Sequence, residues 1–230
     1  MNQIQSHLIV TATLKDPYAA AKVIAFYAHS NGKSSLFYAE RLLLCLQNKS
    51  TFIWNTMIQA FVEKNEPVRA FSLYKHMLES NYVPNNFTFS FVIRACIDVL
   101  NLPMGLCFHG QVVKFGWQSY DFVQNGLIHL YANCGFMDLA RKLFDMSTKR
   151  DVVTWTCLIN GYLKFGQVLI ARELFDKMPE KNPVSWGAMI AGYVQVGFFK
   201  EALEVFNDMQ VSGFKPNHAS IVGVLTACAF

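Results

Sequence analysis

The sequence predicts an all-α protein in which helical hairpins stack side by side into a solenoid. Three observations support this prediction. The chain resembles itself, because VVTWTCLINGYLKFG at 152–166 and PVSWGAMIAGYVQVG at 183–197 share their tryptophan, isoleucine, tyrosine and glycines. The shared apolar positions are spaced three, four and seven positions apart, which is the spacing of one helix face. A glycine follows each such face, where a helix is expected to end.

Each repeat contains two apolar stripes, and we expect one helix to carry each of them. The stripes of one repeat are Trp155, Leu158, Ile159 and Tyr162, then Ala171, Leu174, Phe175 and Met178. A single hairpin cannot bury both stripes, so neighbouring hairpins must cover them. Each side chain buried in this way stabilises the fold by about 1.5–3 kcal/mol. We therefore interpret Trp54, Trp155 and Trp186 as core residues rather than exposed stacking platforms.

The repeat positions divide the chain into segments of two main lengths. The predicted segments are 1–16 (second helix of a truncated repeat), 17–50 (a degenerate repeat), 51–85, 86–120, 121–151, 152–182, 183–217 and 218–230 (first helix of a truncated repeat). Both ends fall inside a repeat, and a solenoid normally ends in polar caps. We expect the chain to be a piece of a longer array.

Composition excludes several other classes of protein. The chain is 53% apolar and 16% charged with a net charge of +4, which favours anionic partners only mildly. Its six cysteines form no C-x-x-C pair, and its six histidines form no H-E-x-x-H motif. No apolar run reaches the roughly 18 residues of a membrane span. We expect no catalytic residue, no metal, no cofactor, no small-molecule substrate and no membrane partner.

Two families of helical-hairpin repeats have comparable patterns. The tetratricopeptide pattern places glycine where this chain has Ile159, and its repeats keep a constant length of about 34 residues. Here longer repeats (51–85, 86–120 and 183–217) are mixed with shorter ones (121–151 and 152–182). This mixture resembles the pentatricopeptide repeat family, in its plant subfamily of standard, long and short repeats. Repeat 86–120 resembles the long type and repeat 121–151 the short type. The resemblance is carried by VVTWTCLINGYLKFG, VLIARELFDKMPEK, FVQNGLIHLYANCGFMDLARKLFD, and FTFSFVIRAC followed by CFHGQVVKFG.

The resemblance implies a right-handed α-solenoid that binds single-stranded RNA in mitochondria or chloroplasts, with about one base per repeat. In this family the fifth and last residues of a repeat read the base, and the second residue sandwiches it. The implied base-reading residues are Asn55 with Asn85, Asn125 with Asp151, Thr156 with Asn182, and Gly187 with Asn217. The implied sandwiching residues are Phe52, Phe122, Val153 and Val184.

By the family's code, Asn125 with Asp151 resembles a uracil reader and Thr156 with Asn182 an adenine reader. Repeats 121–182 should therefore prefer 5′-UA-3′, because the family binds RNA parallel to the chain. The pair Asn55 and Asn85 resembles a pyrimidine reader that favours cytosine over uracil. Gly187 departs from the pattern, which has a polar side chain at that position.

Lys164 occupies the position where the family often contacts a phosphate. Its counterparts in the other repeats are Glu63, Asp98, Asn133 and Gln195. With so few cations along the predicted groove, the affinity for RNA should depend only weakly on salt.

The resemblance further implies a role in cytidine-to-uridine editing or other processing of organellar transcripts. The H-x-E and P-C-x-x-C motifs of the editing deaminases do not occur in this sequence, so we do not expect an enzyme. We expect the chemistry to come either from a catalytic part beyond Phe230 or from a second partner, a separate deaminase or editing factor. The alternative function is a tetratricopeptide-like scaffold for protein–protein interaction. That scaffold would need Lys and Arg clusters on the first helices, where TFIWNTMIQAFV, VVTWTCLINGYL and PVSWGAMIAGYV have none.

Overall fold

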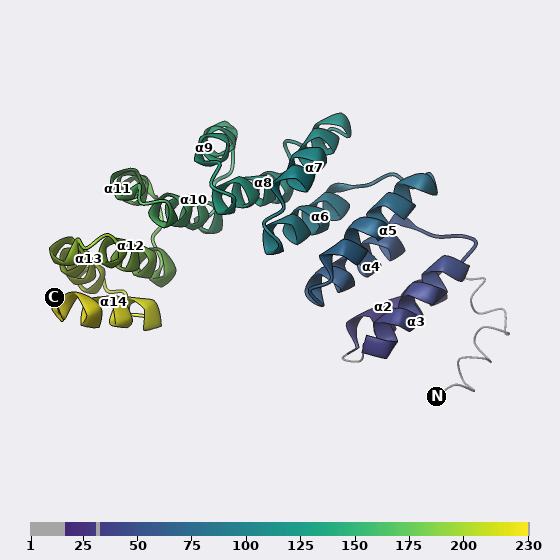
Figure 1. Ribbon diagram of the computed structural model, residues 1–230, viewed down its shortest axis with the longest axis horizontal. Helices are drawn as coiled ribbons and strands as arrows, with labels where there is room; N and C mark the ends of the chain where they lie inside the picture. The colour runs from purple at the N-terminus through teal and green to yellow at the C-terminus, as the bar shows by residue number, and fades with distance from the viewer. Residues whose placement is uncertain (1–16, 31–32, 230) are drawn as a thin grey trace. The chain divides into compact units, whose positions relative to one another are not determined.

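The computed structural model describes residues 17–30 and 33–229, and every regular element within them is a helix. The all-α prediction is confirmed (Figure 1). The predicted helix at 1–16 lies outside the described residues. The helices are α2 (Pro17–His29), α3 (Lys33–Cys45), α4 (Thr51–Glu63), α5 (Pro67–Glu79), α6 (Asn86–Asp98), α7 (Leu102–Lys114), α8 (Asp121–Asn133), α9 (Met137–Met146), α10 (Val152–Lys164), α11 (Val168–Lys177), α12 (Pro183–Gln195), α13 (Phe199–Val211) and α14 (His218–Cys228).

The chain forms two compact units, Met1–Val123 and Gln124–Phe230. In the N-terminal unit, α2 packs on α3, α4 on α5 and α6 on α7, while α4 also contacts both α2 and α6. In the C-terminal unit, α10 pairs with α11 and α12 with α13, while α12 also contacts α10 and α14. Each unit is therefore two layers of helices, one of first helices and one of second helices (Figure 1).

The core of each unit is built by the predicted apolar stripes. Trp54, Trp155 and Trp186 are all buried, which confirms their interpretation as core residues. The rings of Phe144 and Trp155 meet edge to face with centroids 4.7 Å apart, and Phe175 meets Trp186 in the same way at 4.8 Å. Each such pair adds roughly 0.5–1.5 kcal/mol beyond its buried area. A second helix is therefore locked onto the first helix of the next hairpin.

Gly166 ends the first helix of its hairpin, as its position predicts. Its φ of 73° is in the left-handed region, which a residue without a Cβ adopts at no steric cost. The backbone N–H of Gly166 donates to the carbonyl of Leu163, and that of Gln167 donates to the carbonyl of Tyr162. These bonds close the helix end and turn the chain toward α11.

The length of the second helix accounts for most of the difference between the shorter and the longer repeats. The second helices α9 and α11, in the shorter repeats, have 10 residues each. Their counterparts α5, α7 and α13 have 13 residues each. The shorter repeats therefore lose nearly one helical turn on the layer of second helices and keep first helices of 13 residues.

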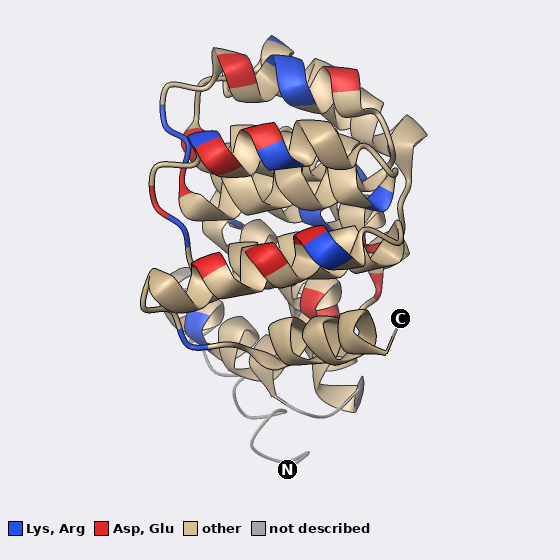
Figure 2. Ribbon diagram, turned by 90° about the vertical axis from the view of Figure 1, so that its left-hand side faces the viewer, with Lys and Arg blue, Asp and Glu red and all other residues tan. Residues whose placement is uncertain are grey.

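Charge in the C-terminal unit is concentrated on the second helices. Acidic and basic residues form bands along α9, α11 and α13, several of them paired along one helix, as Arg172 is with Asp176 (Figure 2). The first helices α10, α12 and α14 contain only one Lys, Arg, Asp or Glu, which is Lys164. These first helices are thus nearly free of charged side chains.

Candidate nucleic-acid interface

The four predicted sandwiching residues lie in the first turn of their helices and project into solvent. Phe52, Phe122, Val153 and Val184 each expose more than half of their surface. These side chains contrast with the buried stripe of the same helices. Of these exposed apolar groups, the two phenylalanine rings have a flat face on which a planar ligand can stack.

The fifth residue of each repeat lies one helical step from the core tryptophan position and is less accessible. Asn55 and Thr156 are buried, and Asn125 is half-buried. The hydroxyl of Thr156 donates to the carbonyl oxygen of Val152 at 2.7 Å, one turn back in α10. Because its hydrogen is used there, Thr156 offers a ligand only oxygen lone pairs.

In the four predicted pairs, the last residue of the repeat is the N-cap of the following first helix. In all four cases a side-chain oxygen accepts a hydrogen bond from the backbone N–H three residues on. The oxygen-to-nitrogen distances are 3.1 Å for Asn85, 2.7 Å for Asp151, 2.8 Å for Asn182 and 2.9 Å for Asn217. This cap fixes which way each side chain faces, since only an oxygen can accept from the backbone N–H.

Two of the predicted pairs are in direct contact. The amide nitrogen of Asn55 donates to Oδ1 of Asn85 at 2.9 Å in the N-terminal unit. The amide nitrogen of Asn125 donates to Oδ2 of Asp151 at 3.2 Å. Oδ1 of Asn125 is buried and has no hydrogen-bond partner among the described residues. An unpaired buried acceptor costs about 1–3 kcal/mol, so this amide gains if it turns its oxygen toward a donor.

The third pair lines a cavity of about 390 Å³ in the C-terminal unit. Thr156 and Asn182 are both on its wall, together with the sandwiching residues Val153 and Val184. The lining comes from α8, α10 and the start of α12: His129, Ala132, Asn133, Val152, Val153, Thr156, Cys157, Asn160, Gly161, Lys164, Asn182 and Val184. All the residues that the sequence assigned to repeat 152–182 therefore gather at one hollow.

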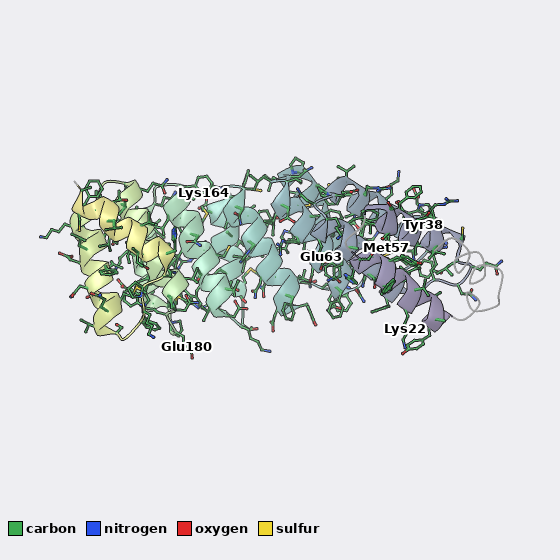
Figure 3. All side chains as sticks on the ribbon, turned by 90° about the horizontal axis from the view of Figure 1, so that it is seen from below. Lys22, Tyr38, Met57, Glu63, Lys164 and Glu180 are labelled. Atoms are coloured by element: carbon green, nitrogen blue, oxygen red, sulfur yellow. The ribbon has the colours of Figure 1, made fainter. Side chains whose placement is uncertain are left out.

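Lys164 stands at the end of α10 and also lines this cavity. Its ammonium lies 3.3 Å from the carbonyl oxygen of Asn133 and is exposed. Figure 3 shows Lys164 and Glu180 at opposite edges of the C-terminal unit. The cavity therefore has its cation at one edge, beside the ends of α8 and α10.

The fourth pair is arranged differently. A Cβ atom added to Gly187 would lie 2.8 Å from Oδ1 of Asn217, so the Asn217 side chain fills the space of a fifth residue. The amide nitrogen of Asn217 donates to the carbonyl of Pro183 at 2.8 Å. Asn217 is thus held by its own repeat and its cap.

The cysteine that lines the cavity is not activated as a nucleophile. Burial raises the pKa of the Cys157 thiol to about 12, so this thiol stays protonated and unreactive at neutral pH. Burial likewise raises the pKa of the nearby Cys134, while Lys164 acts in the opposite direction. Among the described residues no cluster of His, Cys, Asp and Glu could hold a metal ion. In the same part of the chain, no helix has the length and apolar character to cross a bilayer.

Several polar residues of this surface were not predicted from the sequence. Asn133 and Asn160 line the cavity, and hydroxyls at Thr88 and Thr154 contact the capping residues. The capping signal was readable in the sequence, because four of the repeat-ending residues are followed three residues later by Ser or Thr. This holds for Asn85, Asp151, Asn182 and Asn217.

Comparison with known proteins identifies the architecture. A model described as the PPR repeat family matches residues 49–98, 150–183 and 181–229, more than half of the chain, and a PPR repeat model matches 125–152. The chain belongs to the pentatricopeptide repeat family. A mitochondrial pentatricopeptide repeat-containing protein of Arabidopsis thaliana is 38% identical over 71% of this chain and 24% of its own length. Another mitochondrial member from Arabidopsis thaliana is 32% identical over 99% of the chain and 25% of its length.

The chain spans about a quarter of the length of the curated pentatricopeptide repeat proteins that it matches. Among solved structures, the maize pentatricopeptide repeat protein PPR10 is similar with a TM-score of 0.63 and 20% identity. That similarity covers 91% of this chain and 31% of PPR10. PPR10 in complex with an 18-nt psaJ RNA element has a TM-score of 0.61 and 16% identity, over 92% of this chain and 38% of that one. These structures support the helical-repeat fold.

Proposed function

We propose that this chain binds single-stranded RNA in a sequence-specific way, with one base per hairpin, in a mitochondrion or chloroplast. The observation that carries the proposal is the cavity that gathers Val153, Thr156, Lys164, Asn182 and Val184. Family membership supports it, as do an RNA complex of the structural neighbour PPR10 and relatives named as mitochondrial. Apolar side chains would sandwich the base, two polar groups would read its edge, and Lys164 would contact a phosphate.

The hydrogen-bonding groups at Thr156 and Asn182 suit adenine. Thr156 offers an acceptor, because its hydrogen is donated to Val152. Asn182 uses Oδ1 as a cap and keeps its amide nitrogen as a donor. The Watson–Crick edge of adenine presents the complementary arrangement, with the N6 amino group as donor and N1 as acceptor.

The groups at Asn125 and Asp151 suit uracil instead. Oδ1 of Asn125 has no partner among the described residues and would turn outward to meet a base. Both this oxygen and the carboxylate oxygen Oδ2 of Asp151 are acceptors. Uracil presents an N3–H donor between its two carbonyls, whereas cytosine has a lone pair at N3. The preferred order along repeats 121–182 is then 5′-UA-3′.

We assign this binding to transcript processing, with cytidine-to-uridine editing as the first candidate. The mixture of longer and shorter repeats supports this assignment by its resemblance to the plant subfamily. The chemistry would then be supplied by a separate deaminase or editing factor. A peptide-binding scaffold has less support, since Lys164 is the one Lys or Arg on the described helices α10, α12 and α14.

The decisive variant is Thr156→Asn, with binding measured by fluorescence anisotropy on labelled RNAs that differ at one position. The wild type should bind RNA containing 5′-UA-3′ more tightly than 5′-UC-3′ or 5′-UU-3′. The variant should move this preference toward a pyrimidine, because an amide replaces an acceptor-only hydroxyl. The expected change is roughly 2- to 10-fold for each hydrogen bond exchanged.

Thr56→Asn is the matched control for this experiment. Thr56 is also buried, and its hydroxyl donates to the carbonyl of Phe52 at 2.9 Å in the same way. It occupies the sixth position of its repeat, so the base preference should stay the same. A Thr156→Asn protein that folds and keeps the preference for 5′-UA-3′ would refute the proposed reading.

A further inference from the structure

In the N-terminal unit, the cap on α6 determines the orientation of the Asn85 side chain. The backbone N–H of Thr88 donates to Oδ1 of Asn85 at 3.1 Å. Only the oxygen of an amide can accept this bond, so the nitrogen of Asn85 must face away from the helix. No hydrogen bond from that nitrogen occurs within the described residues, and it remains available to a ligand.

The orientation of Asn55 follows from that of Asn85. The nitrogen of Asn55 donates to Oδ1 of Asn85 at 2.9 Å, so the oxygen of Asn55 must face the other way. There it meets the hydroxyl of Thr88 at 2.6 Å, while Oδ1 of Asn85 lies farther from that hydroxyl, at 3.1 Å. Thr88 is fully buried, and its oxygen also accepts the backbone N–H of Asn85 at 3.0 Å. We therefore assign the hydroxyl hydrogen of Thr88 to the shorter contact, with Asn55.

These contacts leave the pair Asn55 and Asn85 with one kind of free group. The oxygen of Asn85 accepts hydrogen bonds from the backbone N–H of Thr88 and from the amide of Asn55. The oxygen of Asn55 accepts from the hydroxyl of Thr88. What remains for a ligand is N–H from both amides. Cytosine presents two acceptors, N3 and O2, to such donors, while uracil presents an N3–H donor that would oppose them.

The corresponding hydroxyl in the C-terminal unit makes a different contact. Thr154 follows Asp151 as Thr88 follows Asn85, and its hydroxyl donates to Oδ1 of Asp151 at 2.7 Å. It does not reach Asn125, whose Oδ1 is left without a partner among the described residues. The threonine hydroxyl at this position therefore contacts the fifth residue, Asn55, in one case and only the capping residue, Asp151, in the other.

We propose that Thr88, which lies in the following repeat, is a third specificity-determining residue for the base read by repeat 51–85. It makes the Asn55 and Asn85 pair prefer cytosine over uracil by holding the Asn55 amide in a donor-only orientation. Thr88 acts as a positioning residue, since it is buried and reaches the base only through Asn55. Two bonds hold the Asn55 amide, one to Oδ1 of Asn85 and one from the Thr88 hydroxyl. Without the hydroxyl, only the bond to Asn85 opposes a turn of the amide that would present its oxygen to N3–H of uracil. This inference rests on the proposed function of the pair.

The test compares the affinities of the full chain for two RNAs, 5′-CAUA-3′ and 5′-UAUA-3′, in identical flanking sequence. Thr88→Val removes the hydroxyl and keeps the shape, and it should lower the preference for cytosine by about 2- to 10-fold. Thr88→Ser keeps the hydroxyl and should retain the wild-type preference. Thr154→Val is the matched control and should leave the cytosine preference unchanged. Thr88→Ala carries the same expectation as Thr88→Val if valine does not fit.

Asn85→Asp separates this inference from the proposed function. It converts the cap to a carboxylate and should move the preference toward uracil if the pair reads a base at all. A shift with Asn85→Asp but none with folded Thr88→Val or Thr88→Ala would overturn the role of Thr88 and leave base reading intact. If Asn85→Asp also leaves the preference unmoved, base reading by this pair is refuted as well.

Discussion

The hairpins α10–α11 and α12–α13 share their core pattern but differ at the fifth residue. Thr156 and Asn182 line an open cavity, and no described group ties one side chain to the other. At Gly187 the side chain of Asn217 occupies the vacant space and donates to the carbonyl of Pro183. Both asparagines cap the next helix equally well. Capping is thus the shared structural role, and we propose that the fifth residue decides whether the cap can also read a base.

The largest expected effect comes from removing the two caps in turn. Asn182→Ala and Asn217→Ala should each lower the free energy of unfolding by about 1 kcal/mol, because each leaves a helix N–H without its acceptor. Only Asn182→Ala should also abolish the preference for adenine. Chemical unfolding and RNA binding measured on both variants test this separation. Equal loss of base preference in the two variants would show that the hairpins do not differ in reading.

A second variant would give repeat 183–217 the fifth side chain that Gly187 lacks. Gly187→Thr supplies the missing fifth side chain and displaces the Asn217 amide, whose Oδ1 lies 2.8 Å from the new Cβ position. The variant should then bind RNAs with adenine after 5′-UA-3′ roughly 2- to 10-fold more tightly than RNAs with another base there. Ala188→Thr adds the same side chain one residue on and should create no preference. Absence of any adenine preference in a folded Gly187→Thr protein would contradict the role given to the fifth residue.

The smallest effect concerns the end of the same two helices, where Lys164 corresponds to Gln195. Lys164→Gln should weaken binding to all sequences about equally and lower the slope of log affinity against log salt by about 1. Gln195→Lys should raise that slope by a similar amount. Binding titrations from low to moderate salt measure both. A sequence-dependent loss in Lys164→Gln would argue that the lysine contacts a base.

Much of the fold could be predicted because it depends on local spacing. The stripe from Trp155 to Tyr162 and the turn at Gly166 are set by residues within one helix of each other, and the structure confirms them. The short second helices were not predicted as such, although the repeat lengths contained the information. Whether each predicted pair reads a base remains a prediction.

The contacts of the site were less accessible to sequence reasoning. The hydroxyl of Thr88 meets Asn55 across 33 residues, and Asn217 reaches Pro183 across 34. Such bonds depend on side-chain rotamers and on the packing of residues more than 30 positions apart in the sequence. Thr88 and Thr154 are both threonines and occupy the same position of their repeats, three residues after Asn85 and Asp151. They make different contacts because the amide of Asn85 and the carboxylate of Asp151 differ in the hydrogen bonds they can accept.

Selection of bound RNA from a random pool tests the central claim most directly, namely that the outward groups at the caps of successive first helices each read one base. We predict that selected RNAs share uracil then adenine opposite repeats 121–151 and 152–182, with no fixed base opposite repeat 183–217. A selected pool without any common sequence, or one with its strongest preference opposite Gly187, would contradict it.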